Sequence, residues 1–159
     1  MHRSAALLRK LSYVSLLVVL VAVAGVQLIA GQFPIGPVVL ALSIVPLLGL
    51  LLAGRFFLSA IPDLIFGAID TGLLAIPALW GGLAFGVAGA IAGGVIGDAL
   101  TDAIAGFFEG GIAEWLRERG IEESREPVTS GLGKMAGCLL GSGVVLCIAL
   151  LAGVEPKFG

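Results

Sequence analysis

The amino-acid sequence predicts an all-α integral membrane protein, a compact bundle of about five transmembrane helices with glycine-rich packing faces. Hydrophobic residues make up 58% of the chain and charged residues only 13%, against roughly 25% charged residues in an average soluble domain. A chain of 159 residues can hold several apolar runs of about 20 residues, each sufficient to cross a bilayer once. No segment outside these runs is long enough to fold alone, so we expect residues 1–159 to form a single membrane domain.

Residues 11–30 and 38–53 form the first two predicted spans. The first is long enough to cross the hydrocarbon once. Because basic residues precede it and it contains Ala22-Val23-Ala24, a cleavable signal peptide is the alternative interpretation. The segment Gln32–Pro37 separates the two spans, since its prolines and glycine interrupt a helix. Pro46 lies inside the second span, where we expect a kink.

Residues 64–79 and 83–105 are the third and fourth predicted spans. Pro62 and Asp63 precede the third span, and a proline followed by an acid in the first turn is typical of a helix start. Trp80-Gly81-Gly82 separates the two spans and suits a tight turn at the membrane interface, with the tryptophan at headgroup level. A turn centred near Gly86 is the alternative; it would place Asp70 opposite Asp102, whereas a turn near Gly81 would set Asp70 about one turn deeper than Asp98.

Residues 107–130 are predicted to form a charged cytosolic loop, and residues 132–151 the fifth span. Acidic and basic side chains crowd the segment from Glu114 to Glu126, which indicates a solvated loop or a short surface helix. Lys134 lies near the start of the fifth span. We expect its ammonium group to reach the inner headgroups, or alternatively to pair with a buried aspartate.

The basic residues predict a multi-pass protein of the cell membrane with a cytoplasmic N-terminus and an external C-terminus. Cytoplasmic loops carry an excess of Lys and Arg, and five spans in this orientation place nearly all of them on or near the inner side. These inner residues are Arg3, Arg9, Lys10, Arg55, Arg117, Arg119, Arg125 and Lys134, with only Lys157 outside. Removal of the first span as a signal peptide would leave the remaining topology unchanged.

The composition predicts that the chain's partner is the lipid bilayer. Assembly into a homo-oligomer or with other membrane subunits is also possible. The net charge is −2 and the Lys and Arg residues are dispersed. Such a charge pattern excludes nucleic acid as a partner.

Glycines recur at intervals of four in the last two predicted spans, a pattern known as a glycine zipper. They are Gly89, Gly93 and Gly97 in the fourth span and Gly133, Gly137 and Gly141 in the fifth. In lipid no hydrophobic effect drives helices together, and rows of small residues let two backbones approach closely. The pattern predicts close packing within one bundle, which we favour, or the lining of an oligomeric pore.

Three aspartates lie inside the predicted spans, Asp70 in the third and Asp98 and Asp102 in the fourth. A charged side chain at the bilayer centre costs about 2.5–3.5 kcal/mol on insertion scales, so an intramembrane acid indicates ion handling, proton relay or metal binding. The alternative is that Asp98 and Asp102 mark the membrane boundary, with the fourth helix ending near Gly97.

Helical geometry aligns these acids with others in the chain. On one helix Asp98 and Asp102 are about 40° apart, and Glu109 falls within about 20° of both. These three acids therefore form one stripe. Asp63 and Asp70 share a face of the third span in the same way.

Thr71 and Thr101 stand next to two of the acids and add hydroxyl groups, which can also bond back to their own helix. Carboxylates brought together in a low dielectric repel unless a cation or protons intervene. Oxygen ligands suit Mg²⁺ or Ca²⁺, and in a transporter Na⁺ or H⁺. We therefore expect Asp70, Asp98 and Asp102 to line one cytosol-facing cavity as an ion or proton site. Mg²⁺ or another cation is the cofactor that such a site would take.

Cys138 and Cys147 lie in the fifth span at a spacing that places them on opposite faces of a helix, which excludes a disulfide between them. We interpret them as packing residues. The single histidine, His2, lies near the N-terminus. A zinc site built from Cys and His therefore has no ligand set.

These features favour a small cation transporter or channel over two alternatives. The first is an accessory subunit of a membrane complex, in which glycine faces contact other subunits and the acids pair with a partner's basic residue. The second is a Mg²⁺-dependent enzyme acting on a lipid phosphate. Such an enzyme needs several cationic donors beside its metal, and the chain offers only Lys134 and Arg55. Transport is therefore favoured over catalysis, and no catalytic residue is assigned.

The spacing Gly94-x-x-x-Asp98-x-x-x-Asp102 matches the second half of the signature of CDP-alcohol phosphotransferases. The first half, an Asp-x-x-Asp-Gly-x-x-Ala-Arg segment, is absent upstream, and Pro77 stands about where the first of its acids would be. The match therefore does not place the chain in that family.

Overall fold

The computed structural model describes residues 2–55, 57–121 and 126–154, with side chains from residue 5 onwards. The side chain of Arg3, and all of Arg125 and Lys157, on which the predicted orientation partly depends, lie outside the described residues. The described part of the chain is helical and contains no β-strand. Its elements are α1 (His2–Ala30), α2 (Ile35–Leu42), α3 (Ile44–Leu52), the 3-10 helix η1 (Phe57–Ala60), α4 (Ile61–Glu118) and α5 (Pro127–Leu151).

Four helical stretches among the described residues are long and apolar enough to cross a membrane. They are Ala5–Ala30, Ile35–Leu52, Phe57–Glu118 and Pro127–Leu151. The expectation of an all-α fold made of long apolar helices is thus confirmed. The third stretch contains both the third and the fourth predicted span.

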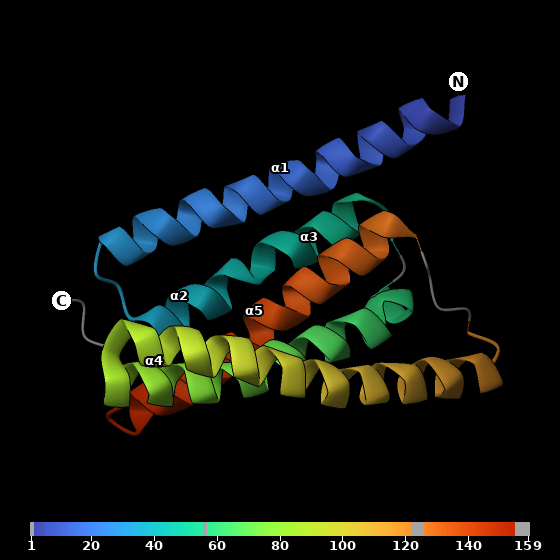
Figure 1. Ribbon diagram of the computed structural model, residues 1–159. Coiled ribbons are helices and arrows are strands. Elements are labelled where there is room, and N and C mark those ends of the chain that lie inside the picture. Colours follow the sequence, from blue (N-terminus) through green and yellow to red (C-terminus); the bar gives the residue numbers. More distant parts are fainter. Residues whose placement is uncertain (1, 56, 122–125, 155–159) are drawn as a thin grey trace.

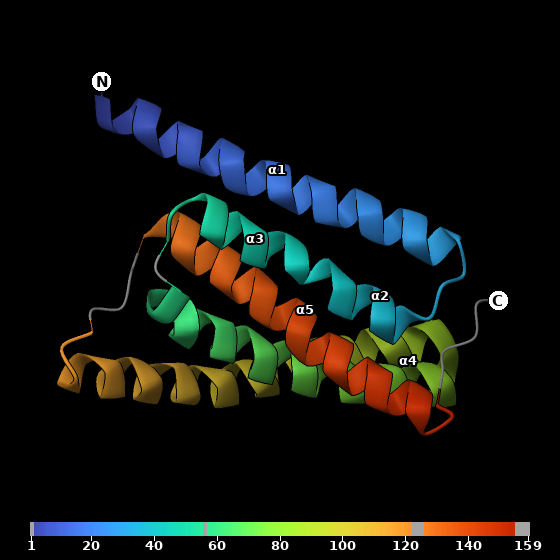
Figure 2. The ribbon, with the colours of Figure 1, turned by 180° about the vertical axis from the view of Figure 1, so that it is seen from behind.

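Helix α5 occupies the middle of the bundle, where it packs against α1, α2, α3 and α4. The two ribbon views show α1 along the outside of α2 and α3, and α4 on the other side of α5 (Figures 1 and 2). Helix α1 is fastened by Tyr13, whose hydroxyl donates a hydrogen bond to the carbonyl oxygen of Gly49 at 2.8 Å. A buried apolar cluster lies where α3, η1 and α5 meet and consists of Leu50, Ala60, Val128 and Leu132.

Helix α4 is a helical hairpin, because the chain reverses direction at Gly86 (Figure 1). Gly86 has φ 63° and ψ −148°, a backbone conformation that is essentially restricted to glycine. The expectation of a tight turn at Trp80-Gly81-Gly82 is therefore wrong, since these residues remain helical. Gly81 instead lies against Gly89 of the returning arm, where a Cβ on either glycine would collide with the other's carbonyl group.

The two arms of the hairpin, residues 61–85 and 87–118, are roughly 37 and 48 Å long at 1.5 Å per residue. Each is long enough for one bilayer crossing. The first arm begins as the sequence predicts, with Pro62 in the first turn and Asp63 as the first-turn acid.

The predicted span 38–53 is divided into α2 and α3 at Ser43. Pro46 has no N–H group to donate to the carbonyl of Leu42, the residue at which α2 ends. The hydroxyl of Ser43 donates to the carbonyl oxygen of Leu40 at 2.6 Å. The helix is therefore interrupted at Ser43, within one turn of Pro46, where a kink is expected.

The predicted charged loop 107–130 is helical over much of its length, because α4 continues to Glu118 and only a short segment separates it from α5. Falling hydropathy does not end a helix when the residues are strong helix formers such as Glu, Arg, Ala and Leu. The helix ends at Gly120, which has φ 70°. There the N–H of Ile121 donates to the carbonyl oxygen of Leu116 at 3.0 Å, closing a Schellman motif.

Glycines allow α5 to lie directly against the first arm of α4. A Cβ at Gly137 would collide with the carbonyl oxygen of Leu64, and a Cβ at Gly141 would collide with that of Ala68. At Gly137 and Gly141 the two backbones are so close that a residue with a Cβ atom would not fit.

The remaining predicted packing glycines are also in contact with the first arm of α4. A Cβ at Gly93 would collide with the carbonyl oxygen of Pro77, and a Cβ at Gly97 would lie 2.8 Å from the ring of the same proline. A Cβ at Gly133 would lie 3.0 Å from the Cβ of Asp63. All of these contacts lie within one chain.

We expect Gly137→Ala to destabilise the bundle by about 1–3 kcal/mol, because an extra methyl group at a filled contact forces the backbones apart. The free energy of unfolding in detergent micelles, followed by circular dichroism, measures the effect. Gly94→Ala is the matched control, since Gly94 is helical and has open space around its Cα. The control should leave stability unchanged or raise it by up to about 1 kcal/mol. An equal loss in both variants would contradict the role of close backbone approach.

Candidate functional site

Asp70 and Thr101 face each other across the hairpin, one from each arm of α4. The hydroxyl of Thr101 donates to Oδ1 of Asp70 at 2.6 Å, and only 7% of Asp70 and 5% of Thr101 is exposed. The reversal at Gly86 sets this register, since residues nearly equidistant from the bend become neighbours. The structure thus joins two residues that the sequence proposed for one site.

The Oγ1 atom of Thr101 also lies 3.3 Å from the carbonyl oxygen of Asp98, one turn earlier in the same arm. A hydroxyl has a single proton to donate. That proton can therefore be donated to the Asp70 carboxyl group or to the Asp98 carbonyl oxygen.

Helix α5 closes the surroundings of Asp70 from a third side. Cys138 of α5 lies near Asp70 and near Thr71, the residue next to it. The hydroxyl of Ser142 donates to the carbonyl oxygen of Cys138 at 2.5 Å. Asp70 therefore lies among hydroxyl and thiol groups, and it forms no ion pair with any described residue.

Asp98 and Asp102 lie on the exposed surface of the second arm rather than in the interior. The buried face of this arm carries Gly97, Thr101 and Ala105. Each aspartate follows a buried residue by one position, which is about 100° around the helix. The prediction that Asp98 and Asp102 lie on the same face of the helix is consistent with this arrangement. The prediction that this face lines a buried cavity is not, because both side chains are exposed.

The described residues contain no group of three or more His, Cys, Asp or Glu side chains that could hold a metal ion. Ca²⁺ takes about six to eight oxygen ligands, and Mg²⁺ is bound by one or two carboxylates together with several waters; Asp70 is the only carboxylate of the pair with Thr101. The structure therefore does not support a divalent-ion site built from three carboxylates.

Glu109 and Lys134 come together where α5 lies over both arms of α4. The Nζ atom of Lys134 is 3.4 Å from Oε2 of Glu109 and 3.9 Å from the centroid of the Phe66 ring. Lys134 thus pairs with an acid, but the acid is Glu109 and not a buried aspartate. Asp63 is buried on the first arm, 5% exposed, where α5 packs against it.

A second polar cluster joins α1, the end of α3 and the start of α5, and we did not predict it. Both Lys10 and Arg55 bind Oε1 of Glu126, at 2.7 and 3.2 Å. Glu126 also caps α5, because its Oε2 accepts hydrogen bonds from the N–H groups of Val128 and Thr129, each at 3.1 Å. Pro127 at the first helical position signals a helix start, but Glu is not among the residues usually preferred at an N-cap. The basic partners of Glu126 are distant in sequence and carry no such signal.

The surroundings of Glu126 favour its ionised form. Burial by itself would raise the pKa of Glu126, but the hydrogen bonds from Lys10 and from the Thr129 amide, together with the charges of Arg55 and Lys10, outweigh it. The pKa of this carboxyl therefore lies below its ordinary value.

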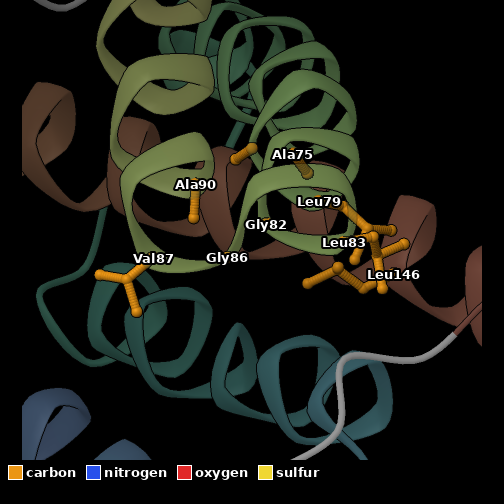
Figure 3. A pocket seen from close by; sticks show the side chains of 9 residues that line it. Ala75, Leu79, Gly82, Leu83, Gly86, Val87, Ala90 and Leu146 are labelled. Atoms are coloured by element: carbon orange, nitrogen blue, oxygen red, sulfur yellow. The ribbon is translucent and has the colours of Figure 1, made fainter.

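A cavity of about 500 Å³ lies beside the bend of the hairpin (Figure 3). Small and apolar side chains of both arms line it, including Gly82 and Ala90, together with Leu146 of α5. Its lining contains no titratable side chain, and neither Asp70 nor Thr101 belongs to it. We assign no chemistry to this cavity.

Comparison with known proteins identifies no relative: no protein-family model, curated protein or solved structure matches the chain. Function is therefore inferred from the residues described above.

We expect Thr101→Val to lower the free energy of unfolding by about 1–3 kcal/mol, because it leaves the buried Asp70 carboxylate without its hydrogen-bond donor. A double-mutant cycle with Asp70→Asn in detergent micelles measures the coupling, expected at about 0.5–3 kcal/mol. Asp102→Asn is the exposed control and should change stability by less than about 0.5 kcal/mol. Additive effects of the Asp70 and Thr101 substitutions would show that the hydrogen bond does not stabilise the fold.

We expect acid to remove most of the stability difference between the native chain and Glu126→Gln. The pKa of Glu126 is lower in the folded chain than the ordinary value of 4.5. The ionised carboxylate therefore stabilises the folded state above about pH 4.5, and this contribution is lost as the pH falls through the folded-state pKa. Thermal unfolding in detergent from pH 7 to pH 3 measures it, with the exposed Glu118→Gln as control. A difference in Tm that is constant over this range would contradict the prediction.

Proposed function

We propose that the chain is a small multi-pass membrane protein that carries a proton or another small monovalent cation at Asp70. Membrane insertion is supported by the large apolar side chains that α1 and the second arm of α4 leave exposed. Among them, 66% of Leu16, 78% of Val87 and 79% of Phe107 is accessible. Soluble monomers rarely expose apolar patches above a few hundred Å², and lipid chains would cover these.

A five-crossing topology with a cytoplasmic N-terminus follows if each arm of α4 crosses once. The end of α3, both ends of α4 and the start of α5 lie at the same end of the bundle (Figure 1). Arg55, Arg117 and Lys134 belong to these segments. Because cytoplasmic loops are enriched in Lys and Arg, this distribution supports a cytoplasmic assignment for that end.

The observation that carries the proposal is the burial of Asp70 with a hydroxyl as its partner and no cationic side chain bound to it. A buried charge without a counter-ion is strongly unfavourable, so such a group takes up a proton or a cation. Asp70 lies roughly 24 Å from the bend of the hairpin along the helix axis. If the bend lies at the outer boundary of a hydrocarbon layer of about 30 Å, Asp70 would be inside the layer and nearer its cytoplasmic side.

A proton is the cargo that fits the geometry best. A Na⁺ ion would require further oxygen ligands, as a divalent ion would.

The exposure of Asp98 and Asp102 favours a second candidate function, that of a subunit in a larger membrane complex. Neighbouring Ile96 and Leu100 are 64% and 63% exposed on the same arm. On a lipid-facing surface each carboxylate would cost about 2.5–3.5 kcal/mol, and a basic side chain from another subunit would offset this cost. The Mg²⁺-dependent lipid-phosphate enzyme is not proposed, because the described residues offer no three-acid ligand group for the metal.

Asp70→Asn tests the transport proposal. The purified chain is reconstituted into liposomes that contain a pH-sensitive dye, and a pH gradient is imposed together with a K⁺ diffusion potential. Wild-type chain should dissipate the gradient. The Asn variant should fall to the rate of protein-free liposomes, because an amide cannot take up the proton.

Asp102→Asn is the matched control and should retain the wild-type proton flux, since Asp102 is exposed and outside the buried pair. Wild-type flux in Asp70→Asn would remove Asp70 from transport. Absence of flux in the wild type, combined with copurification of other membrane subunits, would instead support the accessory role.

A further inference from the structure

The start of α5 forms one wall of a cavity of about 350 Å³ whose other walls come from α1 and from the end of α3. Cationic and apolar groups line it together. The cationic groups are Arg9, Lys10 and Arg55, and the apolar wall includes Leu52 and Val128. A cavity with this lining suits an amphipathic anion, because one part binds negative charge and the other binds hydrocarbon.

Among the described residues, the cavity is lined by three cationic side chains and no acidic one. Lys10 and Arg55 share the carboxylate of Glu126, while Arg9 is exposed and forms no ion pair with the described residues. Within the described part of the chain, the cations at the cavity therefore outnumber the acid that binds them. The surplus can be neutralised by an anionic group with several oxygen acceptors.

Arg55 also presents a donor that the fold leaves unsatisfied. Its Nε–H group is buried and finds no hydrogen-bond partner among the described residues. A buried donor without an acceptor costs about 1–3 kcal/mol. An acceptor oxygen bound in the cavity would remove that cost, and Arg binds phosphate oxygens through such donors.

We propose that this cavity binds the phosphate of an anionic phospholipid headgroup, with the acyl chains against Leu52 and the exposed side of α1. The proposal rests on the membrane insertion proposed above and is independent of any transport at Asp70. The cavity lies at the basic end of the bundle, where an inner-leaflet headgroup would be found. Through Arg9 and Arg55 the lipid would connect α1 to α3, helices that already meet where Tyr13 bonds to Gly49 and where Leu17 packs beside it.

A lipid titration tests the proposal. Purified chain in a neutral detergent is titrated with dioleoylphosphatidylglycerol or dioleoylphosphatidylcholine, and the rise in Tm gives an apparent affinity. We expect phosphatidylglycerol to stabilise the chain and phosphatidylcholine to have little effect. Arg9→Gln and Arg55→Gln should each weaken binding of phosphatidylglycerol about fivefold, the amount expected for one surface cation.

Arg119→Gln removes the same charge from an exposed position outside the cavity and should bind as wild type. Arg55→Gln also removes the ion pair with Glu126 and could therefore unfold the chain. In that case Arg9→Gln alone tests the proposal, because Arg9 forms no ion pair with a described residue. Asp70→Asn should also bind phosphatidylglycerol as wild type, which separates this result from that of the transport assay.

Equal stabilisation by the two lipids would overturn the proposal, as would wild-type affinity in Arg9→Gln and Arg55→Gln. Inorganic phosphate serves as a third ligand. If it stabilised the chain at the same concentration as phosphatidylglycerol, the cavity would be a free-phosphate site and the lipid assignment would be wrong.

Discussion

Close backbone approach at glycine is the constraint on which the rest of the structure depends. Gly137 and Gly141 place α5 directly on the carbonyl groups of Leu64 and Ala68 in the first arm of α4. If the chain is inserted in a bilayer, as proposed, no hydrophobic effect drives its helices together, and dispersion between closely packed backbones is what holds them. Because α5 is also the helix that contacts α1, α2 and α3, a looser fit here would displace the whole bundle.

The same type of contact sets the register of the hairpin. Gly81 packs against Gly89, and the Pro77 carbonyl lies where a Cβ of Gly93 would be. With these positions locked, Thr101 comes opposite Asp70. The polar pair is therefore a consequence of small residues placed nearer the bend. A shift of one residue in either arm would turn Thr101 away, because successive residues lie about 100° apart around a helix.

The two polar sites of the molecule give their carboxyl groups different kinds of partner. Asp70 lies inside the bundle with a neutral hydroxyl partner and no ion pair to a described residue. Glu126 has two cationic partners and two backbone amides, which lower its pKa and hold three chain segments together.

The sequence by itself determined the helical class, the approximate limits of the apolar segments, the start of the first α4 arm at Pro62 and the interruption near Pro46. These features depend on local composition and on the chemistry of proline, which do not require distant partners. It also proposed Asp70 and Thr101 for one site, and the fold brings these two residues into contact.

Only the tertiary structure decided that the chain reverses at Gly86 rather than near Gly81, that Asp98 and Asp102 face outwards, and that Lys10 and Arg55 meet at Glu126. Helical periodicity gives the angle between residues on one helix, but it does not say which face of that helix meets a neighbour. That choice is made by backbone contacts between glycines and segments far away in the chain. The spacing of the glycines can be read from the sequence. Which backbone groups pack against them is known only from the fold.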